Sequence, residues 1–375
     1  MFRKIPQYLL VAINILLSVA MVVCAFSQYI HPHEHPDISF LGMLFPVFLV
    51  LTLLFVFIWI VTPKRKLSLI SITAMLICAG SIRTYCPVNW RSTPPPEAIK
   101  VISYNVMGMN SQENWHPETS TILQFLLSQD ADIVCLQESS SYFDSWKSLT
   151  TSTYPYQKLI LDKGVKLSVL SKFPILSCER LDYESVNNCS YALTLAVEKK
   201  KEKEDDGHRN APDTLLLINN HLESYKLAPQ DREDYKDLIR HPEGYEAVIR
   251  HPHHNAPEEK SLALIRKINA ANAIRSSQAD SVAKYVDTHP YKYAIVCGDF
   301  NDSPMSYTHY RLTRHLNDSY TRGGLGPGFS YNKSGMFFRI DNILVSPNIS
   351  VCKSKIDTYS KISDHYPIIS WLILQ

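Results

Sequence analysis

The chain has 375 residues, 45% of them hydrophobic, and a formal net charge of only +2. This length allows about two or three domains, and the near-neutral charge excludes a protein that coats nucleic acid through an overall basic excess. The eight cysteines follow no CxxC or Cys/His spacing of the zinc-binding kind, which excludes a zinc finger as well.

Three apolar runs near the start of the chain predict a membrane anchor over residues 1–92. The runs cover residues 8–26, 38–61 and 67–82. A helix that spans the hydrocarbon core needs about 20 mostly apolar residues, a length that the first two runs reach. The third run is shorter and relies on Lys66 and Arg83 to extend toward the interface. We expect about three transmembrane helices rather than a cleaved signal peptide, because a second spanning run follows the first at once.

Lysine and arginine placement predicts the orientation of this anchor. Arg3 and Lys4 precede the first run and residues 64–66 are all basic, whereas residues 31–37 contain neither lysine nor arginine. Basic ends stay in the cytoplasm, so three spans would place the rest of the chain outside it, in a bacterium in the periplasm beside the inner membrane. If the third run does not cross, the rest is cytoplasmic. The sequence implies the lipid bilayer as a partner and no protein partner.

Four of the eight cysteines, Cys24, Cys78, Cys135 and Cys297, lie in apolar segments. A free cysteine in such a segment acts as a small hydrophobic residue. Cys178 and Cys189 differ, because both fall in expected loops and lie close in sequence. A disulfide between them would be permitted in an oxidising compartment.

A proline-rich linker at residues 93–98 separates the anchor from a predicted catalytic domain over residues 99–375. In this domain, short runs rich in β-branched residues predict strands, and two longer patterns, at residues 118–129 and 261–288, predict helices. Many short strands with interspersed helices favour two packed β-sheets flanked by helices. The predicted strands cover residues 100–104, 132–136, 167–170, 191–197, 214–219, 293–297, 340–345 and 368–373.

Two polar stretches interrupt this pattern. Residues 199–210 are densely charged and predict a solvated hairpin tip. Residues 225–260 contain four clustered histidines, which can bind metal, although a surface loop with helical turns is the favoured interpretation. The four are His241, His251, His253 and His254.

Polar side chains repeatedly stand at the ends of the predicted strands. A strand end holds a side chain rigidly at the rim of a sheet, where catalytic groups belong. Carboxylate and amide oxygens suit Mg²⁺, and the absence of a thiolate from the set makes zinc less favoured. Structural roles remain open for three of these residues. Asn105 could cap a turn, Asp341 could pair with Arg339, and His221 could be a core histidine. The set comprises Asn105, Glu138, His221, Asp299, Asn301, Asp341, Asp364 and His365.

Six short segments around these residues resemble those of the endonuclease/exonuclease/phosphatase superfamily, which is DNase I-like, in the family's order and roughly at its spacing. The resemblance covers residues 99–375 and implies a four-layer α/β sandwich, preceded here by transmembrane helices, that carries out metal-assisted hydrolysis at phosphorus. The segments are Ser103-Tyr104-Asn105-Val106, Leu136-Gln137-Glu138, Asn219-Asn220-His221-Leu222, Gly298-Asp299-Phe300-Asn301, Arg339-Ile340-Asp341 and Ser363-Asp364-His365-Tyr366-Pro367.

The resemblance also implies a metal site. Glu138 is expected to be the main ligand, with Asn105 and Asp364 nearby. The expected ion is Mg²⁺, with Mn²⁺ as an alternative.

The remaining roles carried over by the resemblance are catalytic. Asp299 is expected to orient or deprotonate the attacking water, and Asn301 to bind a phosphate oxygen. His365 is expected to contact the scissile phosphate, with its ring held by Asp341. His221 is expected to be a second imidazole that contacts the phosphate or donates a proton.

Three functions compete. A hydrolase of phosphodiester or phosphomonoester bonds in nucleic acid or nucleotides is slightly favoured, and a lipid or small-molecule phosphodiesterase is the alternative. A non-catalytic binding protein is disfavoured, because every expected catalytic residue type is present. A nuclease needs cations along its cleft, and the available ones are Lys163, Lys166, Lys172, Arg322 and Lys333. One departure from the family pattern, Asn188-Cys189-Ser190-Tyr191 in place of an arginine, affects substrate positioning.

Overall fold

The computed structural model describes most of the chain, apart from the two polar stretches and several short segments. The histidine cluster at residues 241–254 and the charged residues 199–210 lie outside the described part. The described residues are 7–90, 92–109, 120–139, 143–162, 164–183, 185, 188–197, 212–225, 256–333, 337–360 and 362–375.

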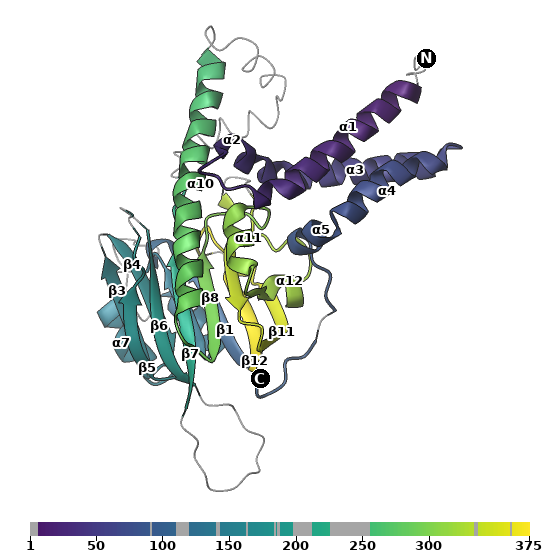
Figure 1. Cartoon of the computed structure of the whole chain (residues 1–375). Helices are drawn as coiled ribbons and strands as arrows, with labels where there is room; N and C mark the ends of the chain where they lie inside the picture. Colours follow the sequence, from purple (N-terminus) through teal and green to yellow (C-terminus); the bar gives the residue numbers. More distant parts are fainter. Residues whose placement is uncertain are drawn as a thin grey trace.

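Two six-stranded sheets form the body of the domain (Figure 1). The first sheet has the order β11-β12-β1-β2-β4-β3, with β1 (Ile99–Asn105), β2 (Ile133–Gln137), β3 (Tyr156–Asp162), β4 (Val165–Ser171), β11 (Ile349–Ile356) and β12 (Ile368–Leu374). The second has the order β5-β6-β7-β8-β10-β9, with β5 (Ile175–Arg180), β6 (Cys189–Val197), β7 (Asp213–His221), β8 (Tyr293–Asp299), β9 (Asn317–Asp318) and β10 (Asp341–Val345). The eight predicted strands are all present.

Both sheets are mixed, and their parallel pairs point the same way. β1 runs parallel to β2, and β7 runs parallel to β8. The carboxyl ends of all four strands therefore meet at one end of the sandwich. β10 is antiparallel to β8 and begins at this same end, because Asp341 pairs with Asp299.

Helices cover the outer face of each sheet, which gives the four layers expected. On the first sheet, α6 (Thr121–Gln129) and α7 (Phe143–Thr150) bury Ile122, Leu126 and Trp146. On the second sheet, α10 (Ala256–Thr288) and α11 (Tyr307–Thr313) bury Ala279, Val282 and Leu312. A short helix, α12 (Ser319–Gly323), packs against β11 and β10.

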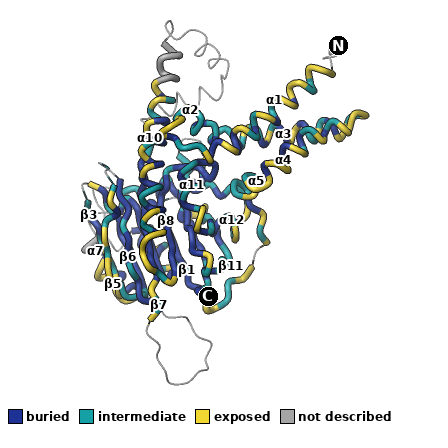
Figure 2. The backbone as a smooth tube through the Cα atoms, in the orientation of Figure 1, coloured by how far each residue is buried: buried dark blue, intermediate teal, exposed yellow. Residues whose placement is uncertain are grey.

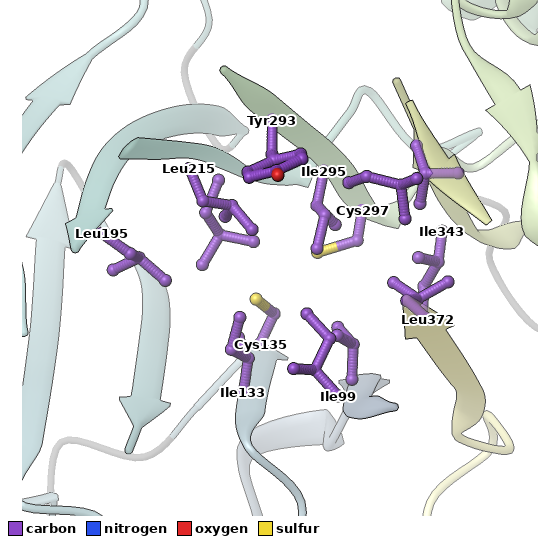
Figure 3. Close-up of a cluster of buried hydrophobic side chains, with 14 of the residues drawn as sticks. Ile99, Ile133, Cys135, Leu195, Leu215, Tyr293, Ile295, Cys297, Ile343 and Leu372 are labelled. Atoms are coloured by element: carbon purple, nitrogen blue, oxygen red, sulfur yellow. The ribbon is translucent and has the colours of Figure 1, made fainter. Parts of the chain in front are cut away.

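The inner faces of the sheets form the main core (Figure 3). Alternate residues of a strand point to the same face, and here the inward series is apolar: Ile133 and Cys135 from β2 meet Leu215, Ile295 and Cys297 from the other sheet. Each fully buried aliphatic side chain of this kind contributes about 1.5–3 kcal/mol. The two sheets are therefore held in a fixed relative position.

Three helices of the N-terminal region form a bundle beside this body (Figure 1). They are α1 (Gln7–Phe26), α3 (Phe45–Ile60) and α4 (Ser68–Ile77), joined by the short elements η1 (Ser27–Tyr29), α2 (Pro36–Ser39), η2 (Phe40–Leu44) and η3 (Arg65–Leu67). Two segments, Gln7–Tyr29 and Pro36–Ile60, are long and apolar enough to cross a membrane. Many of their apolar residues are exposed (Figure 2), as expected of lipid-facing helices.

The third apolar run is not one straight helix. α4 ends at Ile77, and the chain bends by 67° into α5 (Ala79–Tyr85). The bend coincides with Gly80 and Ser81, a residue pair that commonly kinks helices. If the helices α4 and α5 are counted together as one broken span, the chain has three candidate spans in total.

The bundle is attached to the two-sheet domain by one of its two ends. Cys24 of α1, Phe45 of α3 and Cys78 after α4 share a buried cluster with Met305, which belongs to the loop after β8. The helices therefore alternate in direction, and the basic residues 64–66 lie at the opposite end.

The disulfide that the sequence left open does not form, because Cys178 and Cys189 are both free thiols. They lie on neighbouring strands, but the register pairs Cys178 with Leu193. Cys189 precedes Leu193 by four residues on β6, which at about 3.4 Å per residue is roughly 14 Å along the strand. That separation is too large for a disulfide, whose Cα atoms lie about 4–7 Å apart.

Candidate active site

The predicted site residues converge because of strand register. On three strands, the residues that point toward the other sheet change from apolar to polar at the same end. Along this face, Val101 is followed by Asn105 on β1, Leu217 by His221 on β7, and Cys297 by Asp299 on β8. The pairing places His221 opposite Asp299, and Asp299 opposite Asp341. Three side chains thus stand side by side on adjacent strands, facing the end of β1.

Asn105 joins the two sheets at the centre of the site. Its Nδ2 donates to Glu138 Oε1 and to Asp299 Oδ2, both at 3.0 Å. Its Oδ1 accepts from the Met107 amide at 3.1 Å, so the same side chain also caps the turn after β1. Asn105 therefore caps a turn and also contacts two of the predicted site residues.

Strained backbone surrounds these carboxylates. Glu138 and Asn301 have φ values of 51° and 52°, in the left-handed region that non-glycine residues rarely adopt. Such strain costs about 1–3 kcal/mol for each residue and concentrates at functional sites. Gly298 (φ 134°) has a different reason, because a Cβ there would lie 2.0 Å from the Asn220 carbonyl oxygen of β7.

His365 and Asp341 form a buried pair. His365 Nδ1 lies 2.8 Å from Asp341 Oδ2, and its Nε2 lies 3.8 Å from Asp299 Oδ2. Burial lowers the pKa of His365, but Asp341 and then Asp299 outweigh it and raise that pKa to about 10. Burial raises the pKa of Asp341, against the attraction of the ring. The ring is therefore a fixed imidazolium whose Nε2 faces Asp299.

His221 faces the same carboxylates from the other side. Its Nε2 lies 3.7 Å from Glu138 Oε1 and 3.8 Å from Asp299 Oδ2. The ring is 10% exposed, and its Nδ1 has no hydrogen-bond partner within the described part of the chain. His221 is therefore a member of the site rather than a satisfied core histidine.

Two predicted residues make other contacts. Asn301 Nδ2 donates to the Leu222 carbonyl at 2.9 Å, and its backbone amide donates to Asp299 Oδ1 at 2.9 Å. Asp364 Oδ2 lies 3.2 Å from Lys333 Nζ, rather than against Glu138. Its neighbour Ser363 donates to the Asn105 carbonyl at 2.8 Å, which fixes this segment beside the site.

The donor set fits a hard divalent cation. Glu138 and Asp299 offer carboxylate oxygens on either side of Asn105 Nδ2, and Glu138 remains 43% exposed at the mouth. Asn105 Oδ1 accepts from the Met107 amide, so Asn105 would contribute its oxygen only after its amide turned over. Atoms of Asp299, Asp341 and His365 also lie within 4.8 Å of one another and could hold an ion. Because Asp341 and His365 are already joined at 2.8 Å, an ion there would compete with the His365 ring for Asp341.

A polar layer beneath the site was not predicted. Gln137 Nε2 donates to Asn219 Oδ1 at 2.7 Å and to Ser103 Oγ at 3.2 Å. Asn219 Nδ2 in turn donates to the Leu136 carbonyl at 3.2 Å, across the two sheets. These residues occupy inward positions next to the predicted site residues. The two-residue alternation along each strand was the sequence signal that could have identified them.

Two cations support neighbouring loops. Arg275 of α10 is fully buried and lies 3.0 Å from Asp302, while its Nε donates to the Glu223 carbonyl at 2.8 Å. It thereby ties the loops after β8 and β7 to one helix. Arg339 pairs with Asp318 at 2.9 Å, so the alternative pairing of Arg339 with Asp341 does not occur.

Two family models match parts of the chain. The model of the Endonuclease/Exonuclease/phosphatase family matches residues 102–365, and a model described as a domain of unknown function matches residues 7–85. No curated protein matches the chain.

Solved structures share the fold. A humanized D. rerio TDP2 superposes with a TM-score of 0.50 and 15% identity, over 74% of this chain and 99% of that one. The human Nocturnin catalytic domain, with bound sulfate, gives a TM-score of 0.50 and 16% identity, over 76% and 97% of the two chains. Because the family model covers well over half of the chain, the protein belongs to the Endonuclease/Exonuclease/phosphatase family.

Proposed function

We propose that the protein is a divalent-metal-dependent phosphoesterase that uses Mg²⁺, or Mn²⁺ in its place, to hydrolyse phosphodiester or phosphomonoester bonds. The observation that carries this proposal is the position of Asp299. Its carboxylate lies 3.8 Å from the Nε2 atoms of both His221 and His365 and 3.0 Å from Asn105 Nδ2. A reacting phosphate between these groups would meet a base, two imidazoles and a metal site.

Asp299 is suited to act as the general base. Both of its oxygens accept hydrogen bonds, from Asn105 Nδ2 and from the Asn301 amide, so the carboxylate is held in one orientation. A positioned base contributes about 10²–10⁴ to the rate. Asp299 would take the proton that water loses when its oxygen attacks phosphorus.

The two imidazoles are suited to the phosphate. His365, protonated and held by Asp341, would donate from Nε2 to an oxygen that gains negative charge. His221, on the other side of Asp299, would contact a second oxygen or supply the proton that the leaving alkoxide takes up. In this proposal Asn301 orients Asp299 through its backbone amide, and its side chain would have to leave the Leu222 carbonyl to reach a phosphate oxygen.

Glu138 would hold the cation, with Asn105 beside it and Asp364 as a further carboxylate at the rim. When bound, Mg²⁺ supplies Lewis-acid stabilisation of the developing phosphoryl charge. Lys333 restrains Asp364, so recruitment of Asp364 would require this ion pair to open.

The test uses the purified full chain in detergent and the soluble diester bis(p-nitrophenyl) phosphate. We expect hydrolysis that stops with EDTA and returns with Mg²⁺. His365→Ala should lower kcat at least about 10²-fold, because the ring acts mainly in the transition state. Asp280→Asn, which alters another Asp–His pair on the surface of α10, should not. Hydrolysis that persists under chelation would contradict the proposal.

We also propose that residues 1–92 anchor the protein in the membrane, that residues 93–98 link the anchor to the catalytic residues 99–375, and that the latter lie outside the cytoplasm. The helix directions support this: one end of the bundle carries Met305 and the catalytic domain, and the other carries the basic residues 64–66. Basic ends stay in the cytoplasm.

A further inference from the structure

The loop that follows the catalytic base rests directly on the membrane bundle. Met305 is six residues after Asp299, is 1% exposed, and packs among side chains of α1, α3 and the end of α4. Gly42 of η2 approaches so closely that a Cβ there would lie 2.2 Å from the Met305 carbonyl oxygen. These contacts fix the distance between the site and the domain-facing end of the bundle.

The opposite wall of the site rests on the same segment. The rings of Tyr331 and His365 meet edge to face with centroids 5.1 Å apart. Tyr331 in turn belongs to a cluster with Phe40 and Met43 of η2 and Leu264 of α10. Phe40 lies within the candidate span Pro36–Ile60, so Tyr331 links the His365 ring to a cluster that includes residues of this segment.

These contacts set the depth of the site. The bilayer measures about 40–45 Å with its headgroups and about 30 Å without them, which leaves a headgroup layer of roughly 5–8 Å on each side. For a bilayer whose surface meets the domain-facing end of this segment, the His365 ring, 5.1 Å from Tyr331, would lie close to this headgroup layer. Phospholipid phosphates occupy the same level.

The rim of the site is suited to this environment. Phe337 is 55% exposed and pairs with Phe329, with ring centroids 5.9 Å apart, and Lys333 in the same segment is 41% exposed. Exposed aromatic rings and lysines are typical of the membrane–water interface. At the end of α1 that faces the two-sheet domain, Phe26 and Tyr29 are also exposed and contact each other.

We propose that the substrate of this site is a phosphate ester of a membrane lipid, which enters with its acyl chains still in the bilayer. This inference rests on the phosphoesterase function proposed above and adds the substrate class. In the reaction, the oxygen of water forms a bond to phosphorus while a P–O ester bond breaks. The proton of water passes to Asp299 and the leaving alkoxide takes up a proton, which yields an alcohol and a phosphate with one ester bond fewer.

The candidate cations divide between the two ends of the sandwich. Lys172 pairs with Asp130 at the end of the first sheet opposite the site, and Arg322 bonds Asn317, beside the end of β10 remote from Asp341. Lys166 lies at the site end, because its carbonyl accepts from the Ser139 amide, and Lys333 contacts Asp364. Two cations near the site suit a single phosphate group, whereas a nucleic acid is held by contacts to many phosphates.

The test reconstitutes the full chain in vesicles of phosphatidylethanolamine, phosphatidylglycerol and phosphatidic acid. Release of lipid-derived phosphate or alcohol is compared with hydrolysis of bis(p-nitrophenyl) phosphate and of plasmid DNA by the same preparation. We expect Mg²⁺-dependent hydrolysis of the vesicle lipid at least about tenfold faster than of DNA phosphodiesters.

A matched pair of variants separates substrate class from chemistry. Phe337→Asp puts a negative charge on the rim and should lower the ratio of lipid to soluble-diester hydrolysis at least about fivefold. Leu176→Asp changes an equally exposed apolar residue (60%) on β5, remote from the site, and should leave that ratio unchanged.

The outcomes are distinct. If the soluble diester is hydrolysed but vesicle lipid is not, or if DNA is preferred, the lipid inference is overturned and the phosphoesterase function stands. An unchanged ratio in Phe337→Asp also overturns it. If no phosphoester is hydrolysed with Mg²⁺ or Mn²⁺, both proposals fail.

Discussion

Replacing Asp341 by asparagine isolates what its charge does for His365. The amide has the size of the carboxylate and can still accept from Nδ1, which lies 2.8 Å from Asp341 Oδ2 in the wild type. Only the counter-charge is lost. The pair is fully buried, so water does not replace that charge.

The expected effect follows from the pKa of His365. Asp341 and Asp299 together raise it from 6.5 to about 10, against burial. Asp341 is the largest of the contributions that raise this pKa, so its loss should lower the pKa of His365 toward the usual imidazole range. The ring of the variant should therefore lose its proton at a lower pH than the wild-type ring, and the two proteins should differ more at pH 9 than at pH 7.

The ratio of wild-type to variant kcat on bis(p-nitrophenyl) phosphate should therefore be at least about threefold larger at pH 9 than at pH 7. Steady-state rates over this pH range measure it, with circular dichroism to confirm folding. Asp280→Asn, which removes the partner of His31, provides the control and should show no such pH dependence. A ratio for Asp341→Asn that is constant with pH would refute the assigned role of the pair.

Three further predictions follow. Glu138→Gln should raise the Mg²⁺ concentration for half-maximal activity at least about tenfold, and an unchanged Mg²⁺ titration would show that Glu138 is not a ligand. Burial raises the pKa of Asp318, but Arg339 and then His309 hold it well below its usual range of about 4, so its contribution to stability is present above that pH and is lost as the pH falls. The melting temperature should drop on acidification below about pH 4, and Asp318→Asn should flatten that dependence; equal slopes would contradict the assignment. Alkaline phosphatase fused after Pro96 should be active, since that reporter folds only in an oxidising compartment, and a silent fusion would place the domain in the cytoplasm.

The central strands could be predicted because they are apolar along most of their length. β2, β7 and β8 are buried on both faces and contain continuous apolar runs. β3 and β5 were not predicted because they are edge strands with exposed polar positions. Such strands lack the apolar run that marks a central strand, and pairing with their neighbours specifies them.

The membership of the site could be predicted, but its contacts could not. Polar residues after apolar strands identified Asn105, Glu138, Asp299 and His365. The bonds from Asn105 to both Glu138 and Asp299 depend on how the two sheets face each other, which sequence spacing does not determine. The same holds for the ion pair that takes Asp364 to Lys333.

The anchor illustrates a second limit. Its apolar runs predicted membrane spans, yet the same apolar character gave no indication that Met305 and Tyr331 would pack on them. The sequence does not show which residue an apolar side chain will pack against, because hydrophobic burial is non-directional. The seating of the catalytic domain on the bundle is therefore a finding of the structure alone.

The most direct measurement of the proposed chemistry is hydrolysis of bis(p-nitrophenyl) phosphate by the full chain in ¹⁸O-enriched water with Mg²⁺. Attack by water at phosphorus places one ¹⁸O atom in the p-nitrophenyl phosphate product and none in p-nitrophenol, and Asp299→Asn should suppress this product at least about 10²-fold. Label in p-nitrophenol, or product formation that does not depend on Asp299 and Mg²⁺, would contradict hydrolysis at phosphorus by this site.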